Sequence, residues 1–444
     1  MAEVLLYVRP WNMAQFLDLA SKTWPGSTVE TLSEHDGCDG SGFRELFYSY
    51  YRCCKTTPTT VEELPFSDDD IEDIVLRCRL LRSINRPKAL KMIFSAFRAI
   101  ERVLDDQQPR YVLSVTVDSF VIDLLARASR MKGIRFLGLV PTFVNGYFRI
   151  TERGEKAVNR EVSADEVESV LAMLTDQKYK PQWLAPDRGT IRKKAVKLWA
   201  RNLIKPMWFA FYSRWKNDPL NAHYMTTDIV SRRYLSVFPR LYNEIGNLEM
   251  VERIIAKDTR VSVFLPLQMS PEATIDYWSS DLSWIDYEDK ILSLVEEQSE
   301  KYVFIVKEHP NVFGFRTHGF YDELRKIQNV VLVNPEVASN HLLQICDSVL
   351  VCTGTVGFEA LVRGKPVFSS AEPFYAESGN FHSLDDVVER DIRNPLNLVE
   401  YLVSGFLKGT FLNDGTWRRE NETHLKYNQT IAESLSEYLE INEY

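Results

Sequence analysis

Two short apolar stretches in the second half of the chain each run directly into a polar turn that can bind phosphate. The first covers residues 303–310 and ends in Lys307, Glu308, His309 and Pro310; the second begins at Ser348 and leads into a turn at 353–357. Short apolar stretches that alternate with helical segments predict parallel strands, whose carboxyl ends meet at one edge of a sheet. We therefore expect both turns to face one crevice.

The turn at 353–357 has the properties of a phosphate cradle. Thr353, Gly354, Thr355 and Gly357 are small or hydroxyl residues that let backbone N–H groups approach an anion, and a helix predicted to open near Val356 adds its positive dipole end. The spacing matches neither the P-loop nor the dinucleotide-binding fingerprint. ATPase and NAD chemistry are therefore not indicated.

Lys307 and His309 place positive charge beside this cradle. Successive strand residues alternate faces, so these two share a side while Glu308 points away. A Lys, a His and a helix N-terminus can together neutralise the negative charge of a phosphate group. No paired carboxylates follow a nearby strand, so we expect neither a metal nor a cofactor. The alternative for His309 is a capping role before the proline turn.

A base for the acceptor hydroxyl is expected in the N-terminal half. Asp118 follows a predicted strand at residues 111–115 and lies in the turn that faces the crevice, so it is the predicted catalytic base. Asp or Ser at this point can equally cap the helix that starts at Ser119. Both readings stay open.

Composition sets the class of protein. The 444 residues carry a formal charge of -9, which disfavours nucleic acid as a partner, and 45% hydrophobic residues are typical of a globular chain. No apolar stretch approaches the ~20 residues of a membrane span. The N-terminus predicts a first strand at Val4–Val8 and no signal peptide, and six scattered cysteines show no CxxC spacing. We expect a cytoplasmic protein.

The order of predicted elements suggests two doubly wound α/β domains that face an interdomain cleft. The expected boundaries are 1–155 for an acceptor-side α/β domain, 156–255 for a helical linking region, 256–385 for a nucleotide-sugar-binding α/β domain and 386–444 for a helical tail. Further strands are predicted at 134–140, 260–266 and 329–333. Ser67 and the acids after it predict a helix N-cap.

The stretch from Ile191 to Lys216 combines eight basic residues with six aromatic ones and no acid. That composition is typical of an interfacial helix that lies on anionic lipid, at the inner face of the plasma membrane in a cytoplasmic protein. The alternative is a helix whose aromatic residues pack on the core while its cations stay solvated. Pro206 is expected to break the helix in the middle. The two alternatives stay open.

Three segments together resemble the bacterial capsule polysaccharide biosynthesis proteins, a group that includes β-Kdo transferases. They are the segment Phe264–Thr274, then Lys-Glu-His-Pro with Gly314, Arg316 and Tyr321, and then residues 353–361 with the Gly-Lys-Pro-Val that follows. The resemblance covers about residues 261–375. It implies a GT-B glycosyltransferase that moves a sugar from CMP-Kdo or a UDP-sugar to a saccharide or glycolipid acceptor.

The resemblance also implies roles for individual residues. His309, in the His-Pro pair with Pro310, contacts the donor phosphate, the small-residue turn holds phosphate oxygens, and Glu359 reaches the nucleotide ribose. From their place in a stiff proline-flanked loop, Gln268 and Glu272 are expected to line the donor side of the cleft. The chain has no D/E-D/E-G acceptor motif of the related sialyltransferases, so the donor sugar stays open.

Two other functions fit the same plan. A nucleotide-sugar 2-epimerase needs the same cradle but no acceptor, and a non-catalytic sugar-nucleotide-binding subunit of a capsule assembly complex binds nucleotide without turnover.

Overall fold

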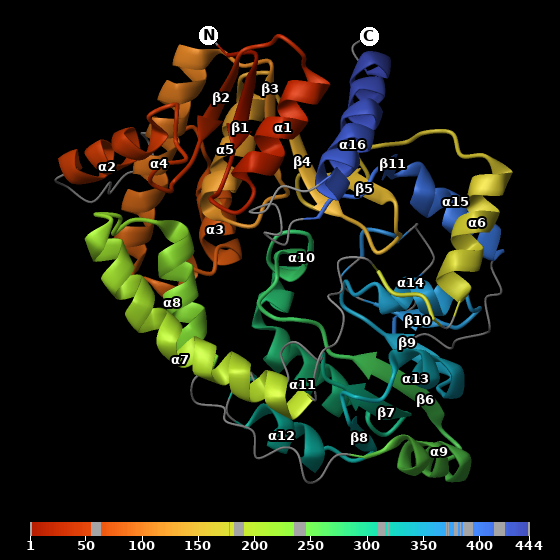
Figure 1. The fold of residues 1–444 in the computed structure, drawn as a ribbon. Coiled ribbons are helices and arrows are strands. Elements are labelled where there is room, and N and C mark those ends of the chain that lie inside the picture. The colour runs from red at the N-terminus through yellow and green to blue at the C-terminus, as the bar shows by residue number, and fades with distance from the viewer. Residues whose placement is uncertain are drawn as a thin grey trace.

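The protein contains two α/β units, each formed around its own sheet (Figure 1). The computed structural model describes residues 2–54, 64–176, 178–181, 191–234, 246–309, 316–317, 319–369, 371, 373–376, 381, 383–384, 394–412 and 422–442. The second unit begins after residue 246, and both sheets are mainly parallel. The predicted fold class, two parallel-sheet α/β units in a GT-B-like arrangement, is confirmed.

The first sheet has the strand order β11-β5-β4-β3-β1-β2. Neighbours among β1 to β4 run parallel, whereas β5 and β11 add an antiparallel edge. Its strands are β1 Val4–Tyr7, β2 Val29–Leu32, β3 Tyr111–Val115, β4 Arg135–Pro141, β5 Tyr147–Ile150 and β11 Leu407–Lys408. The strands predicted at the N-terminus, at 111–115 and at 134–140 are therefore confirmed.

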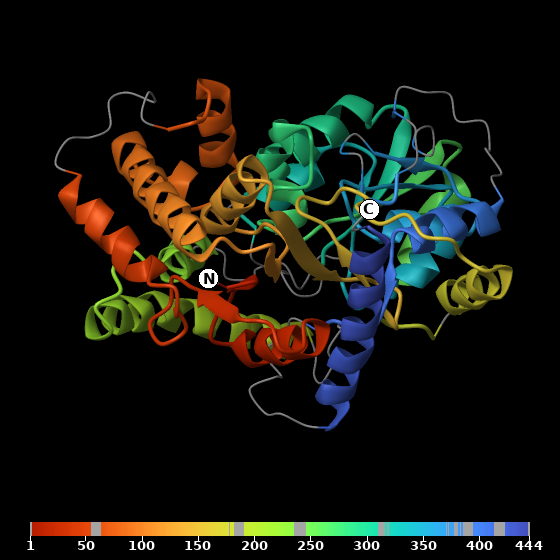
Figure 2. The same cartoon turned by 90° about the horizontal axis from the view of Figure 1, so that it is seen from above.

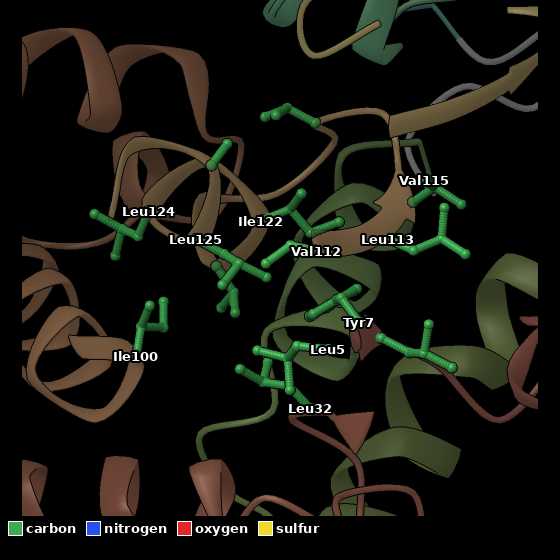
Figure 3. Packing of buried hydrophobic residues seen from close by; sticks show 14 of the residues in the cluster. Leu5, Tyr7, Leu32, Ile100, Val112, Leu113, Val115, Ile122, Leu124 and Leu125 are labelled. Atoms are coloured by element: carbon green, nitrogen blue, oxygen red, sulfur yellow. The ribbon is translucent and has the colours of Figure 1, made fainter. Parts of the chain in front are cut away.

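Helices cover both faces of this sheet, which explains why its central strands β1 and β3 are buried at every position. All residues of β1 and β3 are buried, as expected for parallel strands between two helical layers. Figure 3 shows Leu5 and Tyr7 of β1 packed with Val112 of β3 and Leu125 of a covering helix. The helices are α1 Met13–Thr23, α2 Phe43–Cys53, α3 Asp68–Arg77, α4 Arg86–Gln107 and α5 Phe120–Met131, with a 3₁₀ turn at Leu81–Ser83.

The second sheet is parallel throughout and has the order β10-β9-β6-β7-β8. Because β7 and β9 both pair with β6, the carboxyl ends of these three strands lie side by side. The strands are β6 Val261–Pro266, β7 Tyr302–Lys307, β8 Val330–Val333, β9 Ser348–Leu350 and β10 Val367–Phe368. Its helices include α9 Leu248–Lys257, α10 Ala273–Asp276, α11 Tyr287–Gln298, α12 Phe320–Lys326, α13 Ser339–Ile345 and α14 Val356–Leu361.

The remaining helices connect the two units. Helix α6 (Ala164–Thr175) packs with α15 (Pro395–Ser404) against the core of the second unit, while α16 (Glu422–Ile441) returns to α1 of the first unit. Figures 1 and 2 both show α16 beside the first sheet. The segment expected to be a purely helical tail also contains β11, a strand too short to show a sequence period.

Helices α7 (Ile191–Trp215) and α8 (Ala222–Tyr234) form a hairpin in which α8 packs on the core of the first unit and α7 packs on α8 (Figure 1). The predicted break at Pro206 is wrong, because α7 continues through the proline. A proline inside a helix removes one hydrogen bond and costs about 3 kcal/mol, but packing can outweigh a local penalty. Pro206 lies on the buried side of α7, toward the rest of the protein.

The two units contact each other through side chains from the carboxyl-end side of the first sheet. Arg79 Nε donates to Asp276 Oδ2 at 2.5 Å, and Arg77 donates to the carbonyl oxygens of Asp276 and Ser279. The guanidinium of Arg149 lies 4.0 Å from the centre of the Phe374 ring. The cleft-side loops of both units therefore lie at one interface.

Candidate functional site

The loop after β6 organises the predicted phosphate cradle. Gln268 Nε2 donates to the Thr353 hydroxyl at 2.6 Å, and the Thr353 backbone N–H donates to Gln268 Oε1 at 3.0 Å. The Gln268 backbone N–H donates to the Tyr287 hydroxyl at 2.8 Å, which fixes the loop from behind. Gln268 therefore links the carboxyl ends of β6 and β9 and sets the start of the 353–357 turn.

Glu272 lies in the same network. Its Oε2 accepts from Thr274 Oγ1 at 3.1 Å and from Gln268 Nε2 at 3.4 Å. Burial raises the pKa of the Glu272 carboxyl, although hydrogen bonds from these neighbours and the charge of Arg79 oppose the shift. The predicted pair Gln268 and Glu272 is thus brought together beside the cradle.

Glu308, which lies between Lys307 and His309 in the sequence, forms a buried ion pair with Arg316. The Arg316 guanidinium donates to both Glu308 oxygens at 2.7 Å, and the Tyr321 hydroxyl donates at 2.6 Å. Arg316 also donates to the Gln268 backbone oxygen at 2.6 Å. This buried pair points away from the cradle side, as the strand alternation predicts, and joins the loop after β6 to the loop after β7.

Lys307 is the last residue of β7, and its charge acts on Glu359 in the helix after the cradle. Its Nζ donates to Ser339 Oγ at 2.9 Å, and the charges of Glu308 and Glu359 favour its protonated form. Burial is the larger effect and lowers the pKa of Lys307 to about 8. Glu359 belongs to α14, and burial raises its pKa against the opposing charges of Arg363 and Lys307. Lys307 and Glu359 therefore lie close enough for each charge to act on the pKa of the other.

His309 is neutral at physiological pH in this arrangement. Burial, together with the charges of Lys307 and Arg316, lowers its pKa to about 4, and Glu308 opposes the shift. The expected contribution of His309 is therefore an N–H donor, and the positive charge comes from Lys307. Pro310 and Gly314 lie outside the described residues, so the rest of the predicted His-Pro turn is not placed.

The two glycines of the cradle have different surroundings. A Cβ added at Gly354 meets only Gln268 Oε1, at 4.0 Å, so the space above this residue is open. A Cβ at Gly357 would lie 2.5 Å from the Tyr375 hydroxyl and 2.9 Å from Val351. Gly357 is thus required by packing, whereas Gly354 leaves room for a ligand. Thr355 is the N-cap residue of the six-residue helix α14.

Asp118 does not cap α5, because its carboxylate is held by a residue after β1. Arg9 Nη1 and Nη2 donate to the two Asp118 oxygens at 2.7 and 2.6 Å. The N-cap residue of α5 is Ser119, which makes no side-chain cap bond. Burial acts to raise the pKa of Asp118, but the charge and hydrogen bonds of Arg9, together with the charges of Arg79 and His223, outweigh it, and the net pKa is lowered. The Asp118 side chain is 30% exposed.

Arg79 connects the Asp118 turn with the donor-side loop. Its charge lowers the pKa of both Asp118 and Glu272, which come from different units. Asp118 therefore lies on the side of the first unit that faces the predicted donor site.

Sequence reasoning missed a buried polar cluster beside Asp118. Among the described residues, no well-formed hydrogen bond reaches either carboxylate oxygen of Glu34, the Tyr7 hydroxyl or Arg9 Nε, although all of these atoms are buried. Burial raises the pKa of Glu34 to about 7, with Arg9 opposing. Tyr7 ends β1, Arg9 follows it and Glu34 follows β2. The rule that functional residues gather at the carboxyl ends of parallel strands is the signal that could have found them.

Residues 171–380 match the family described as capsule polysaccharide biosynthesis protein. The predicted family resemblance is thereby confirmed. The matched residues include the loop after β6, Lys307 to His309 and the 353–357 turn.

Among curated relatives, the capsule polysaccharide modification protein LipA of Neisseria meningitidis serogroup A is 25% identical over 194 residues. That alignment covers 43% of this chain and 27% of LipA, and LipA of serogroup B gives the same values. The chain thus spans about a quarter of the length of these capsule proteins.

Two kinds of solved structure resemble the whole chain at low similarity. The KpsC beta Kdo 2,7 transferase of Thermosulfurimonas dismutans is 16% identical with a TM-score of 0.38, and the alignment covers 93% of this chain and 94% of that one. The UDP-GlcNAc 2-epimerase of Methanocaldococcus jannaschii is 13% identical with a TM-score of 0.27, covering 98% and 99%. At these values the superpositions assign no residue roles.

Proposed function

We propose that this protein is a glycosyltransferase of capsule or surface polysaccharide assembly that takes its sugar from a nucleotide-activated donor. The observation that carries the proposal is the junction of the β6, β7 and β9 carboxyl ends. There Gln268 fixes the turn at Thr353, and Lys307 supplies a cation on the adjacent side. The capsule family match over the same residues supports this proposal.

The chemistry follows from charge. When the bond between the sugar and its phosphate breaks, negative charge grows on the phosphate oxygens. Lys307 can offset that charge, His309 can donate an N–H, and the open space above Gly354 admits a phosphate oxygen to the backbone. None of these steps requires a metal, so we propose a metal-independent transfer with the nucleotide sugar as substrate and no cofactor.

The acceptor is proposed to be a saccharide or glycolipid that enters on the Asp118 side. Its hydroxyl must lose a proton as it attacks the sugar, and Asp118 is the predicted base. The ion pair with Arg9 opposes that role, because it stabilises the charged carboxylate and lowers its proton affinity. Asp118 acts as a base only if acceptor binding loosens this pair.

The donor is proposed to be CMP-Kdo or a UDP-sugar, and the reaction is placed in the cytoplasm, where these donors are made. All six cysteines lie within the described residues and none forms a disulfide, which is usual for a reducing compartment. No helix of the described segments is long and apolar enough to span a bilayer.

Thermal shift with CMP, UDP, GDP and CDP tests the proposal, because a ligand that binds the native state raises its apparent stability. The expected result is one preferred nucleotide whose effect disappears in Gly354→Asp. This variant should fold, since the space at Gly354 is open, but it places a carboxylate where phosphate must approach. Ala256→Asp, at an exposed position of α9, serves as a variant that should retain the shift.

Turnover then separates the candidate functions. Transfer to an acceptor with consumption of the donor supports the transferase. Conversion of a UDP-sugar to its epimer without acceptor would support the epimerase, and nucleotide binding without turnover would support an assembly subunit. Absence of any nucleotide effect on the native protein contradicts all three.

A further inference from the structure

The outward side of α7 is an exposed apolar surface. Among the residues that the structure describes, seven of the fourteen exposed large hydrophobic ones belong to this helix, and Met207 and Trp215 are 65% and 67% exposed. The seven are Val196, Leu203, Ile204, Met207, Trp208, Phe211 and Trp215. An exposed patch of this kind marks an interaction site far more often than isolated surface residues do.

The spacing of these residues shows that they form one continuous stripe. Leu203, Met207, Phe211 and Trp215 follow one another at intervals of four, which places them along one side of the helix. Trp208 stacks beside Tyr212 at 6.0 Å, so the stripe is also held together laterally. Residues 203–215 are called the apolar stripe below.

The opposite side of α7 is already used for packing. Phe209 stacks on Tyr224 of α8 with ring centres 5.0 Å apart, and Asn202 is buried. His223 of α8 in turn contacts Trp11 at 4.8 Å, next to the Arg9–Asp118 pair. One face of α7 therefore packs on α8, and no described residue covers the opposite face.

The N-terminal half of the same outward face is cationic. Lys193, Lys197 and Arg201 are exposed and lie four residues apart, in a row that flanks the apolar stripe on the exposed part of the helix. The helix contains no acidic residue, although the whole chain has a formal charge of -9. This face of α7 is therefore positively charged, whereas the net charge of the whole chain is negative.

We propose that α7 docks the protein on an anionic lipid surface, with the apolar stripe in the interfacial region and Lys193, Lys197 and Arg201 against the phosphate headgroups. A bilayer offers negative charge and an apolar phase in one plane, which matches the two halves of this face. The stripe contains Trp208 and Trp215, and tryptophan favours the boundary between headgroups and acyl chains.

The docked arrangement has a consequence for the proposed acceptor site. Because α8 lies between α7 and the Arg9–Asp118 pair, the Asp118 side of the protein faces the lipid surface across the α7–α8 hairpin. Docking itself does not depend on the transferase proposal, so each can fail without the other.

Co-sedimentation with vesicles tests the docking. The native protein should bind vesicles rich in phosphatidylglycerol at low salt and should stay in solution with phosphatidylcholine alone. Binding should weaken at high salt, and tryptophan fluorescence should shift to shorter wavelength on binding. Each cation near such a surface contributes about 1 kcal/mol, so reversing Lys193, Lys197 and Arg201 to Glu should lower the partition coefficient by roughly 100-fold or more.

Two further variants make the result specific. Met207→Ser with Phe211→Ser should abolish the fluorescence shift and most binding, and both positions are exposed, so the fold should persist. Reversal of Arg102, Arg253 and Lys257, exposed cations away from α7, should leave much of the binding intact. Circular dichroism checks that each variant is folded.

Three outcomes would overturn the proposal. The native protein does not bind anionic vesicles at low salt; the α7 charge reversal has no larger effect than the control reversal; or the Met207 and Phe211 variant converts a dimer into a monomer in sedimentation. The last result would mean that a second copy of the chain covers the stripe.

Discussion

The side chain of Gln268 holds Thr353 through two hydrogen bonds, one to its hydroxyl at 2.6 Å and one from its backbone N–H at 3.0 Å. This pair joins residues 85 positions apart in the chain and sets the geometry of the proposed phosphate cradle. Gln268, which the sequence predicts on the donor side of the cleft, therefore connects the carboxyl ends of β6 and β9.

Gln268→Ala should weaken nucleotide binding without unfolding the protein. Two hydrogen bonds that each contribute about 1 kcal/mol position the turn, so the dissociation constant should rise roughly 10-fold or more. Isothermal titration with the preferred nucleotide measures the change. Gln298→Ala, at the end of α11, is the matched control and should bind normally. Equal affinity in both variants would show that the turn holds its shape unaided.

His309→Ala and Lys307→Met should both lower turnover, by roughly 10²-fold for His309 if it is one preorganised donor to the leaving phosphate. The lowered pKa of Lys307, about 8, adds a pH dependence that His309 cannot supply. Lys307 loses its proton as pH rises through that value, so kcat/KM should fall between about pH 7 and 9, and Lys307→Met should lack this fall. A pH profile unchanged in Lys307→Met contradicts the assignment.

Asp118→Asn should retain nucleotide binding and lose transfer, because an amide cannot accept the acceptor proton. The same change leaves Arg9 without its charged partner, so unfolding free energy should fall by roughly 2 kcal/mol. Denaturant midpoint and transfer rate are measured on the same preparation. If Asp118→Asn transfers sugar at a near-normal rate but unfolds more easily, the Asp118 carboxylate only forms the ion pair with Arg9 and is not the base.

Glu34 should make stability depend on pH near neutrality. Its pKa rises from 4.5 to about 7 on folding, so between these values the native state keeps a proton that the unfolded chain has released. Stability contributed by neutral Glu34 is therefore lost as pH rises through this window, by about 3 kcal/mol at most. Glu34→Gln should remove that component in urea unfolding at about pH 5 and pH 8, while the exposed Glu252→Gln should behave like the native protein.

Transfer should persist in EDTA. The proposed site neutralises phosphate with Lys307 and N–H donors, and no group of three or more His, Cys, Asp or Glu residues in the described parts of the chain forms a metal site. The assay compares the initial rate before and after chelation, with Mg²⁺ or Mn²⁺ added back. If chelation abolishes activity and either ion restores it, the metal-free mechanism is wrong.

The sequence alone determined the parts of this protein that depend on short-range patterns. Apolar strands, the cap at Ser67 and the small residues at 353–357 are local features, since strand alternation and capping are decided by residues a few positions apart. The order of strand and helix also predicted that the turns after β7 and β9 face one crevice, because parallel strands bring their carboxyl ends to one edge. In the structure both strands pair with β6, which lies between them.

Only the tertiary structure decided which polar side chains are already paired with one another in ion pairs and hydrogen bonds. Arg9 and Asp118 are 109 positions apart, so no local pattern reveals that the predicted base is held in an ion pair. The burial that raises the pKa of Glu34 and lowers that of His309 likewise comes from several distant elements. For α7, composition left lipid contact and core packing open, since it does not say which side of a helix is covered. Packing of Phe209 on α8 settled that the stripe from Leu203 to Trp215 faces outward.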